Sequence, residues 1–206
     1  MHRIRTTVIV AALTIPFVAS TATADTVFHT WIEAPAEVMV GDTFTISVWT
    51  SLHGSVLHQG NVAFAGFQLH LTSSGIQVEF SEPFDFGVPE YDVGTPADGS
   101  VFNIGGYQWW HTPWNELNWE NPIRLFSANV LVGAAQSGTL SIEPTLWASL
   151  PWMTGWYLDV PNSQGIRDDD PGSTRIITPA TIRVIPTPAS AMVLAFGSFA
   201  FACCRR

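Results

Sequence analysis

The chain has 206 residues, no lysine and eight arginines, against seventeen acidic residues, for a net charge of −9. So few cations exclude nucleic-acid binding through phosphate neutralisation, and an acidic surface favours solubility and repels anionic lipid. The two cysteines, Cys203 and Cys204, are adjacent and close to the C-terminus. Their position excludes a disulfide framework and a cysteine-based zinc site elsewhere in the chain.

The first 24 residues have the three parts of a secretory signal peptide. Arg3 and Arg5 precede an apolar stretch (8–19), and the segment ends in Ala22-Thr23-Ala24, an A-x-A pattern, before Asp25. We therefore expect export, with cleavage between Ala24 and Asp25. The alternative is an uncleaved N-terminal anchor, but the apolar run is shorter than the roughly 20 residues that span a membrane.

Residues 25–184 are predicted to form one all-β domain. Apolar and polar side chains alternate in 43–51, where Phe44, Ile46 and Val48 share one face, and Val40-Gly41-Asp42 supplies the preceding turn. Further strands are expected in 64–72, 75–80, 124–132, 138–147 and 174–184. Turn residues separate these stretches and no long amphipathic helix intervenes, so an antiparallel sandwich is expected rather than an α/β fold.

Three of these pieces, taken in order, resemble the cohesin-like family of β-sandwiches. They are the glycine-aspartate turn into the strand at 43–51, the "GFQ" strand (66–68) with the strand after its short turn, and the later strand followed by "GTLSIEPT" (138–145). The resemblance implies a jelly-roll-like sandwich of about nine strands used for binding rather than chemistry. Two insertions, Leu52–Val62 and Pro83–Asn121, depart from the family pattern, so dockerin recognition is not carried over.

Four tryptophans stand within eleven residues of the second insertion: Trp109, Trp110, Trp114 and Trp119. Exposed indole rings stack on the apolar faces of sugar rings, which makes this loop a candidate glycan-binding site. The alternative is a buried cap at one end of the sandwich, because rings of this size are usually mostly buried. A second aromatic stretch, 146–160, adds Trp147, Trp152, Trp156 and Tyr157 and could pack against the first in a structural cluster.

Metal and catalytic signals are weak. Asp168, Asp169 and Asp170 are a weak calcium candidate, since they lack the alternating spacing of an EF-hand loop and repel one another. No nucleophile elbow, zinc-protease motif or phosphate loop is present. We expect neither catalytic residues nor a cofactor, although a carboxylate pair for glycoside hydrolysis would not be visible in a sequence.

The C-terminal segment 185–206 has three ordered parts. Pro186-Thr187-Pro188 precedes sixteen uncharged residues (189–204), and Arg205 and Arg206 end the chain. We expect this run to form a short transmembrane helix, which would reach about 24 Å against the roughly 30 Å of the hydrocarbon core. The arginines would remain on the cytoplasmic side. A buried core helix is the alternative.

These three parts resemble the PEP-CTERM sorting signal of Gram-negative bacterial envelope proteins, with Thr187 where that family has glutamate. The resemblance implies that an exosortase, an integral-membrane cysteine transpeptidase-like enzyme, cleaves near Pro186–Pro188. It also implies transient or permanent membrane anchoring, followed by the cell surface or the exopolysaccharide matrix. The sequence thus predicts a non-catalytic envelope module for binding or adhesion. The alternatives are a carbohydrate-binding module that uses the tryptophan-rich loop and, with less support, a polysaccharide hydrolase.

Overall fold

The computed structural model describes residues 26–54, 57, 62–108, 118–133, 137–147, 149–159 and 164–187. These residues form thirteen strands and no α-helix. The strands are β1 (Thr26–Glu33), β2 (Glu37–Met39), β3 (Thr43–Gly54), β4 (Ala63–Ser74), β5 (Val78–Phe80), β6 (Glu90–Ala97), β7 (Ser100–Tyr107), β8 (Ile123–Val132), β9 (Gly138–Thr145), β10 (Thr154–Asp159), β11 (Gln164–Arg167), β12 (Ser173–Thr178) and β13 (Ala180–Ile185).

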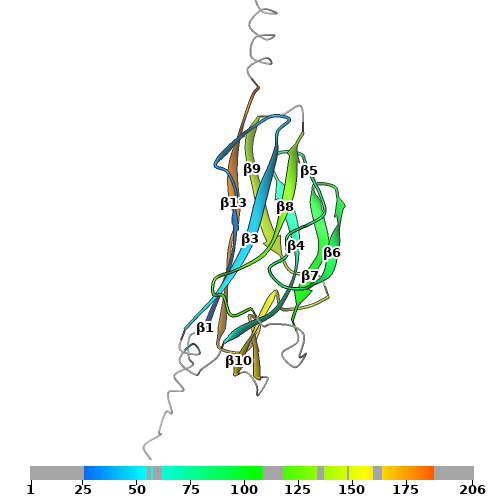
Figure 1. Cartoon of the computed structure of the whole chain (residues 1–206). Coiled ribbons are helices and arrows are strands. Elements are labelled where there is room, and N and C mark those ends of the chain that lie inside the picture. Colours follow the sequence, from blue (N-terminus) through cyan, green and yellow to red (C-terminus); the bar gives the residue numbers. More distant parts are fainter. Residues whose placement is uncertain are drawn as a thin grey trace, which may run out of the picture.

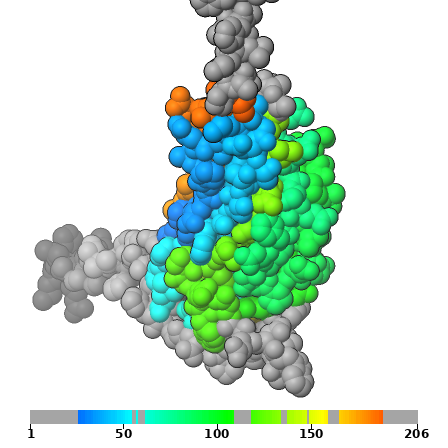
Figure 2. Space-filling model, turned by 45° about the horizontal axis from the view of Figure 1, so that its top comes forward, coloured from blue at the N-terminus to red at the C-terminus, as the bar shows by residue number. Residues whose placement is uncertain are grey.

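The strands form two sheets packed as a sandwich (Figure 1). The first has five strands in the order β12-β1-β3-β8-β5. The second has eight strands in the order β11-β10-β4-β9-β13-β2, with the β6–β7 hairpin attached through the pairing of β7 with β4. Figure 2 shows the blue surface of the N-terminal strands beside the green surface of the hairpin region. The predicted all-β sandwich is confirmed.

The alternation in the sequence matches the burial of the strands. In β3, Ile46 and Val48 are fully buried, and the side chains between and beside them are at least partly exposed. In β4, Phe67, Leu69 and Leu71 point into the core. Core rings also meet across the sandwich, since Phe67 of β4 stacks on Phe126 of β8 with ring centroids 5.6 Å apart. The turn before β3 forms as expected, with Gly41 at a φ of +84°.

The strand count differs from the nine that the cohesin-like resemblance implies. The β6–β7 hairpin lies wholly inside the insertion Pro83–Asn121. Its turn is Asp98-Gly99, with φ of +48° and +73°, and positive φ at both central residues is the geometry of a two-residue hairpin turn. The "DG" dipeptide was therefore a hairpin signal that the sequence analysis did not use.

The stretch 174–184 is also two strands rather than one. Pro179 has no backbone N–H to donate, and the chain changes sheets there: β12 joins the five-stranded sheet and β13 the eight-stranded one. Both strands add a parallel pairing to an otherwise antiparallel sandwich, β12 with β1 and β13 with β2. These two parallel pairs lie at sheet edges.

The end of β13 lies far from the strand pairs at the other end of the eight-stranded sheet. Val184 pairs with Gly138 at the start of β9, whereas Thr145 at the end of β9 pairs with His70 of β4. The first residues of β4 pair with β10. Figure 1 shows β10 at the lower end of the sandwich and the last residues of β13 at the upper end. Within the described residues no helix is both long enough and apolar enough to cross a membrane.

Candidate functional site

The candidate site arises where one edge of β4 changes partner. Residues 63–67 pair with β10 and residues 70–74 pair with β9, while β7 pairs with residues 66–72 on the opposite edge. The chain between β9 and β10, described at 146–147 and 149–153, forms no strand. Its contacts nevertheless satisfy β4: Gln68 N–H donates to Met153 O at 2.9 Å, and Trp147 Nε1–H donates to Leu69 O at 2.9 Å. The sheet thus opens without leaving these buried backbone groups unpaired.

The opening is a groove of about 760 Å³ on the outer face of the eight-stranded sheet. This volume lies within the usual range for ligand sites. The walls are aromatic, and the floor is largely glycine backbone. The aromatic residues are Tyr91, Tyr107, Trp147, Trp152 and Tyr157, and the glycines are Gly66, Gly105, Gly155 and Gly165.

Strand register explains why the floor of the groove lacks side chains. Gly155 of β10 lies between Arg167 of β11 and Gly66 of β4, and Gly66 faces Tyr107 of β7. Two side-chain-free positions therefore separate Arg167 from Tyr107 over a span of about 14 Å, given roughly 4.8 Å between neighbouring strands.

Packing requires only some of these glycines. A Cβ on Gly66 would lie 2.7 Å from Tyr107 Cβ, so a larger residue is excluded there. A Cβ on Gly155 would meet nothing closer than Ile166 O at 3.6 Å, and one on Gly105 nothing closer than Phe67 O at 3.5 Å. These last two positions have room for a side chain and lack one. Packing therefore requires glycine at Gly66 but does not by itself require it at Gly105 or Gly155.

The aromatic walls are held in place by named contacts. Tyr91 and Tyr107 lie with ring centroids 5.2 Å apart, and the Tyr157 hydroxyl donates to Gln108 O at 3.0 Å. The Arg167 guanidinium lies over the Trp152 ring, 5.2 Å from its centroid, in a cation–π contact. Tyr91 is 65% exposed, so most of its side chain remains accessible to solvent.

Trp156 has a different role from its neighbours in the second aromatic stretch. It is fully buried, and its ring meets Phe64 edge to face at 5.1 Å. It belongs to the core although it borders the groove, whereas Trp147, Trp152 and Tyr157 line the groove with partly exposed rings. The expected aromatic cluster is therefore partly core and partly surface site.

The tryptophan-rich loop begins at the groove wall. Gln108, a lining residue, accepts a hydrogen bond from Asn118 N–H at 3.0 Å and donates to Phe64 O. These contacts tie both ends of the loop to β4. Trp119 is 48% exposed, and Trp109, Trp110 and Trp114 lie outside the described residues.

The three consecutive aspartates have separate structural roles. Asp168 is 4% exposed, accepts hydrogen bonds from Met153 N–H (2.9 Å) and Thr154 N–H (3.3 Å), and forms an ion pair with Arg175 at 2.6 Å. Asp170 accepts a hydrogen bond from Arg167 N–H at 2.7 Å, and Asp169 is exposed. Across the described part of the chain, no three His, Cys, Asp or Glu side chains are grouped so as to hold a metal ion.

The other predicted residues lie at or beyond the ends of the described chain. Pro186 and Thr187 follow β13 directly. Pro188, Arg205 and Arg206 lie outside the described residues, as do Ala22, Ala24 and Asp25 of the expected signal-peptide cleavage site.

The sequence analysis missed Tyr91, Tyr107, Arg167 and the glycine floor. Tyr91 and Tyr107 lie in the insertion that departs from the family pattern, and Arg167 is 60 residues beyond Tyr107. Only the pairing of β4 with both β7 and β10 brings them to one groove. The "GGY" run at 105–107 was the one local signal, since paired glycines inside a strand mark a close approach or an open surface.

Comparisons with known proteins concern the arrangement of the strands. No family model matches the sequence, and no curated protein matches it. The structure is similar to a cohesin module from a Clostridium perfringens family 33 glycoside hydrolase, at 12% identity and a TM-score of 0.49, over 79% of this chain and 99% of that chain. The chain is similar to cohesin modules.

Two further solved structures show the range of the likeness. A type II cohesin domain from the cellulosome of Acetivibrio cellulolyticus has 16% identity and a TM-score of 0.46, over 75% of this chain and 94% of that chain. A CARDB domain from Pyrococcus furiosus, in complex with di-metal ions, has 10% identity and a TM-score of 0.35, over 78% and 94%. At these identities nothing about the ligand of this chain follows from the likeness.

Substitution of Asp168 tests whether the buried aspartate holds the wall segment that carries Trp152. We expect Asp168→Asn to lower the free energy of unfolding by about 3 kcal/mol, because Arg175 would keep its charge without a buried partner. Urea unfolding followed by tryptophan fluorescence measures the change. Asp169→Asn, at an exposed neighbour, is the control and should leave the unfolding midpoint in place. Equal effects of the two variants would contradict a structural role for Asp168.

A pH dependence follows from His70, which stacks on Trp147 with ring centroids 6.3 Å apart. Burial lowers the pKa of His70 below its ordinary value, and its Nδ1 accepts a hydrogen bond from Asn103 N–H at 2.9 Å, which requires the neutral ring. Neutral His70 therefore stabilises the fold above the unfolded-state pKa, and this contribution is lost as the pH falls through the lowered folded-state pKa. Between about pH 7.5 and about pH 5 we expect the stability advantage of the wild type over His70→Gln to shrink in urea unfolding. Parallel stability profiles for the two proteins would contradict this expectation.

Proposed function

We propose that the protein is an exported, non-catalytic binding module and that its aromatic groove holds a saccharide chain. The observation that carries this proposal is the combination of aromatic walls with a glycine floor, in which Gly105 and Gly155 have room for a side chain and lack one. Such a floor lets a flat ring lie close to the sheet while the aromatic faces flank it. The sandwich then serves to hold the aromatic side chains of the groove walls in position.

The chemistry of the lining fits a saccharide. Pyranose rings carry C–H groups on their faces, which stack on indole and phenol rings, and hydroxyls on their edges, which both donate and accept hydrogen bonds. Arg167 offers side-chain N–H donors, and Asp170 offers carboxylate oxygens. One cation and one anion among the lining residues leave the groove nearly neutral in a strongly acidic protein, which favours a neutral glycan.

The tryptophan-rich loop is proposed as an extension of the same site. It follows Gln108 directly in the sequence, and Gln108 lines the groove. Trp109, Trp110, Trp114 and Trp119 would then add stacking positions beyond Tyr107. This extends the carbohydrate-binding hypothesis from the loop alone to the loop together with the sheet face.

Binding is proposed rather than hydrolysis because of the carboxylates. Glycoside hydrolysis usually requires two carboxyl groups flanking the bond to be cleaved. Among the described lining residues Asp170 supplies one, and it already accepts a hydrogen bond from Arg167 N–H. A stacking site with one carboxylate, which is already hydrogen-bonded to the backbone, is suited to binding a glycan without cleaving it.

The location of the protein is proposed from its two ends. A signal peptide (1–24) would export the chain, and the Pro186-Thr187-Pro188 motif, the uncharged run and Arg205-Arg206 would sort it through an exosortase-like membrane enzyme. The module would then reach the cell surface or the exopolysaccharide matrix. A glycan-binding groove is consistent with residence in such a matrix.

Two groove variants test the proposed function in the full-length protein. Tyr91→Ala removes an exposed wall ring, and Gly105→Ala places a methyl group on the floor, 3.7 Å from Tyr91 Cδ1. We expect each to weaken retardation by soluble neutral glucans, mannans or xylans in affinity electrophoresis by about tenfold, as for loss of a central contact. Gly105→Ala should keep or raise the melting temperature, because alanine reduces the entropy of the unfolded chain.

The matched control is Phe102→Ala, which removes an exposed ring from the same sheet outside the groove. It should bind the polymers as the wild type does. Full binding by both groove variants would show that the groove is not the site. Turnover of any of the polymers by the wild type would contradict a non-catalytic role.

Sorting is tested by the intact mass of the protein recovered from envelope and extracellular fractions of the native host. We expect a chain that begins at Asp25 and ends near Pro186–Pro188. A chain that still ends in Arg205-Arg206 and is found only in membranes would contradict tail removal. The module would then be held permanently by its C-terminal segment.

A further inference from the structure

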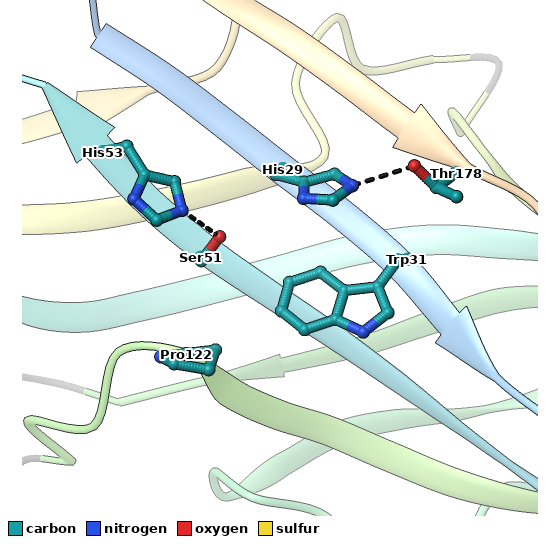
Figure 3. A pocket seen from close by; sticks show the side chains of 6 residues that line it. All are labelled: His29, Trp31, Ser51, His53, Pro122 and Thr178. Carbon is teal, nitrogen blue, oxygen red and sulfur yellow. Dashed lines mark hydrogen bonds between the residues drawn. The ribbon is translucent and has the colours of Figure 1, made fainter.

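A second aromatic hollow lies on the outer face of the other sheet (Figure 3). It has a volume of about 340 Å³ and takes its lining from four elements of the five-stranded half. His29 and Trp31 come from β1, Ser51 and His53 from β3, Thr178 from the end of β12 and Pro122 from the turn before β8. Figure 3 shows the Trp31 indole in the middle, with both imidazoles on one side of it and Pro122 below.

The rings of this hollow are fixed by contacts between neighbouring strands. His29 Nε2 is hydrogen-bonded to Thr178 Oγ1 and His53 Nε2 to Ser51 Oγ, each at 2.8 Å. The His29 ring lies 5.0 Å from the Trp31 ring, which in turn stacks on Trp49 at 6.3 Å and 12°. Ring orientation is thus set before a ligand arrives, which reduces the entropy lost on binding.

The polar groups of the hollow retain bonding capacity. Neither imidazole uses its Nδ1 in a hydrogen bond within the described residues, and each hydroxyl can form more than the one bond to its imidazole. Among the described residues that line it there is no carboxylate, arginine or lysine. An aromatic surface with hydroxyl and imidazole groups around it is complementary to a neutral polyhydroxylated ring.

We propose that this hollow, formed around Trp31, is a second saccharide-binding site that takes a pyranose of a neutral glycan. The ring faces Trp31, and its hydroxyls bond to the two imidazoles and to Ser51 and Thr178. The sites on the two sheets face opposite directions, since each lies on the outer face of its own sheet. If the groove also binds glycan, as proposed above, one molecule holds two glycan strands and cross-links them.

The test uses the full-length protein and the same soluble neutral glucans, mannans and xylans. Affinity electrophoresis measures binding, and light scattering of protein–polymer mixtures measures cross-linking. Trp31→Ala removes the central ring, and His53→Ala removes an exposed side chain whose loss spares the core. Thr45→Ala is the matched control, because Thr45 lies on the same strand and bonds Asn129 away from the hollow.

We expect Trp31→Ala and His53→Ala to retain binding through the groove. The polymer-dependent increase in scattered light should fall by about tenfold, because these variants no longer cross-link the polymer. Tyr91→Ala should lose scattering to the same extent and keep only the weaker binding that the hollow around Trp31 provides, and Trp31→Ala/Tyr91→Ala should lose binding altogether. Thr45→Ala should behave as the wild type. This pattern supports two sites on one molecule.

Other outcomes separate this inference from the proposed function. Unchanged binding and scattering in Trp31→Ala and His53→Ala, with binding abolished in Tyr91→Ala, would overturn the second site and leave the groove in place. Binding abolished in Trp31→Ala and His53→Ala, but unchanged in Tyr91→Ala, would support the second site and overturn the groove. A wild type that binds none of the polymers would overturn both.

Discussion

The structure depends on how β4 satisfies its hydrogen bonds at the point where one edge changes partner. A central strand that lost its neighbour there would expose buried N–H and C=O groups at a cost of several kcal/mol in total. Met153 O and the Trp147 indole N–H fill this position for Gln68 and Leu69. Trp147 donates from its ring nitrogen and remains partly exposed, with its side chain on the lining of the groove. The bond that keeps the sheet intact therefore also builds a wall of the groove.

The same segment is held from its other side by Asp168. Its carboxylate accepts hydrogen bonds from the backbone N–H groups of Met153 and Thr154. It also forms an ion pair with Arg175, which in turn donates a hydrogen bond to Pro151 O. A buried ion pair contributes little unless its remaining bonding capacity is used, and here both backbone and guanidinium donors use it. Structural polar groups thus fix the segment on which Trp152 is placed, and Arg167 of the neighbouring strand stacks on that ring.

The sequence was sufficient for the parts of the fold that depend on local pattern. The alternation around Ile46 and Leu69 gave the two central strands and the direction of their core faces, because a period of two is a local property. It did not show that Pro179 moves the chain from one sheet to the other, since either sheet accepts the same alternating pattern. The alternation with Phe67 and Leu69 places Gln68 on the outer side of β4, yet its side chain is only 7% exposed. It donates a hydrogen bond to Trp152 O, in a segment far along the chain that a local pattern does not reveal.

The position of the last strand has a mechanical consequence. Val184 lies beside the start of β9, and the groove lies beyond the far end of β9, near the first residues of β4. At about 3.3 Å per strand residue, the distance between them is roughly 35 Å along the sheet. If the molecule is attached through the segment after β13, the sandwich holds the groove at this distance from the surface of attachment. A force on a bound polymer would then act on the sandwich in the direction of its strands.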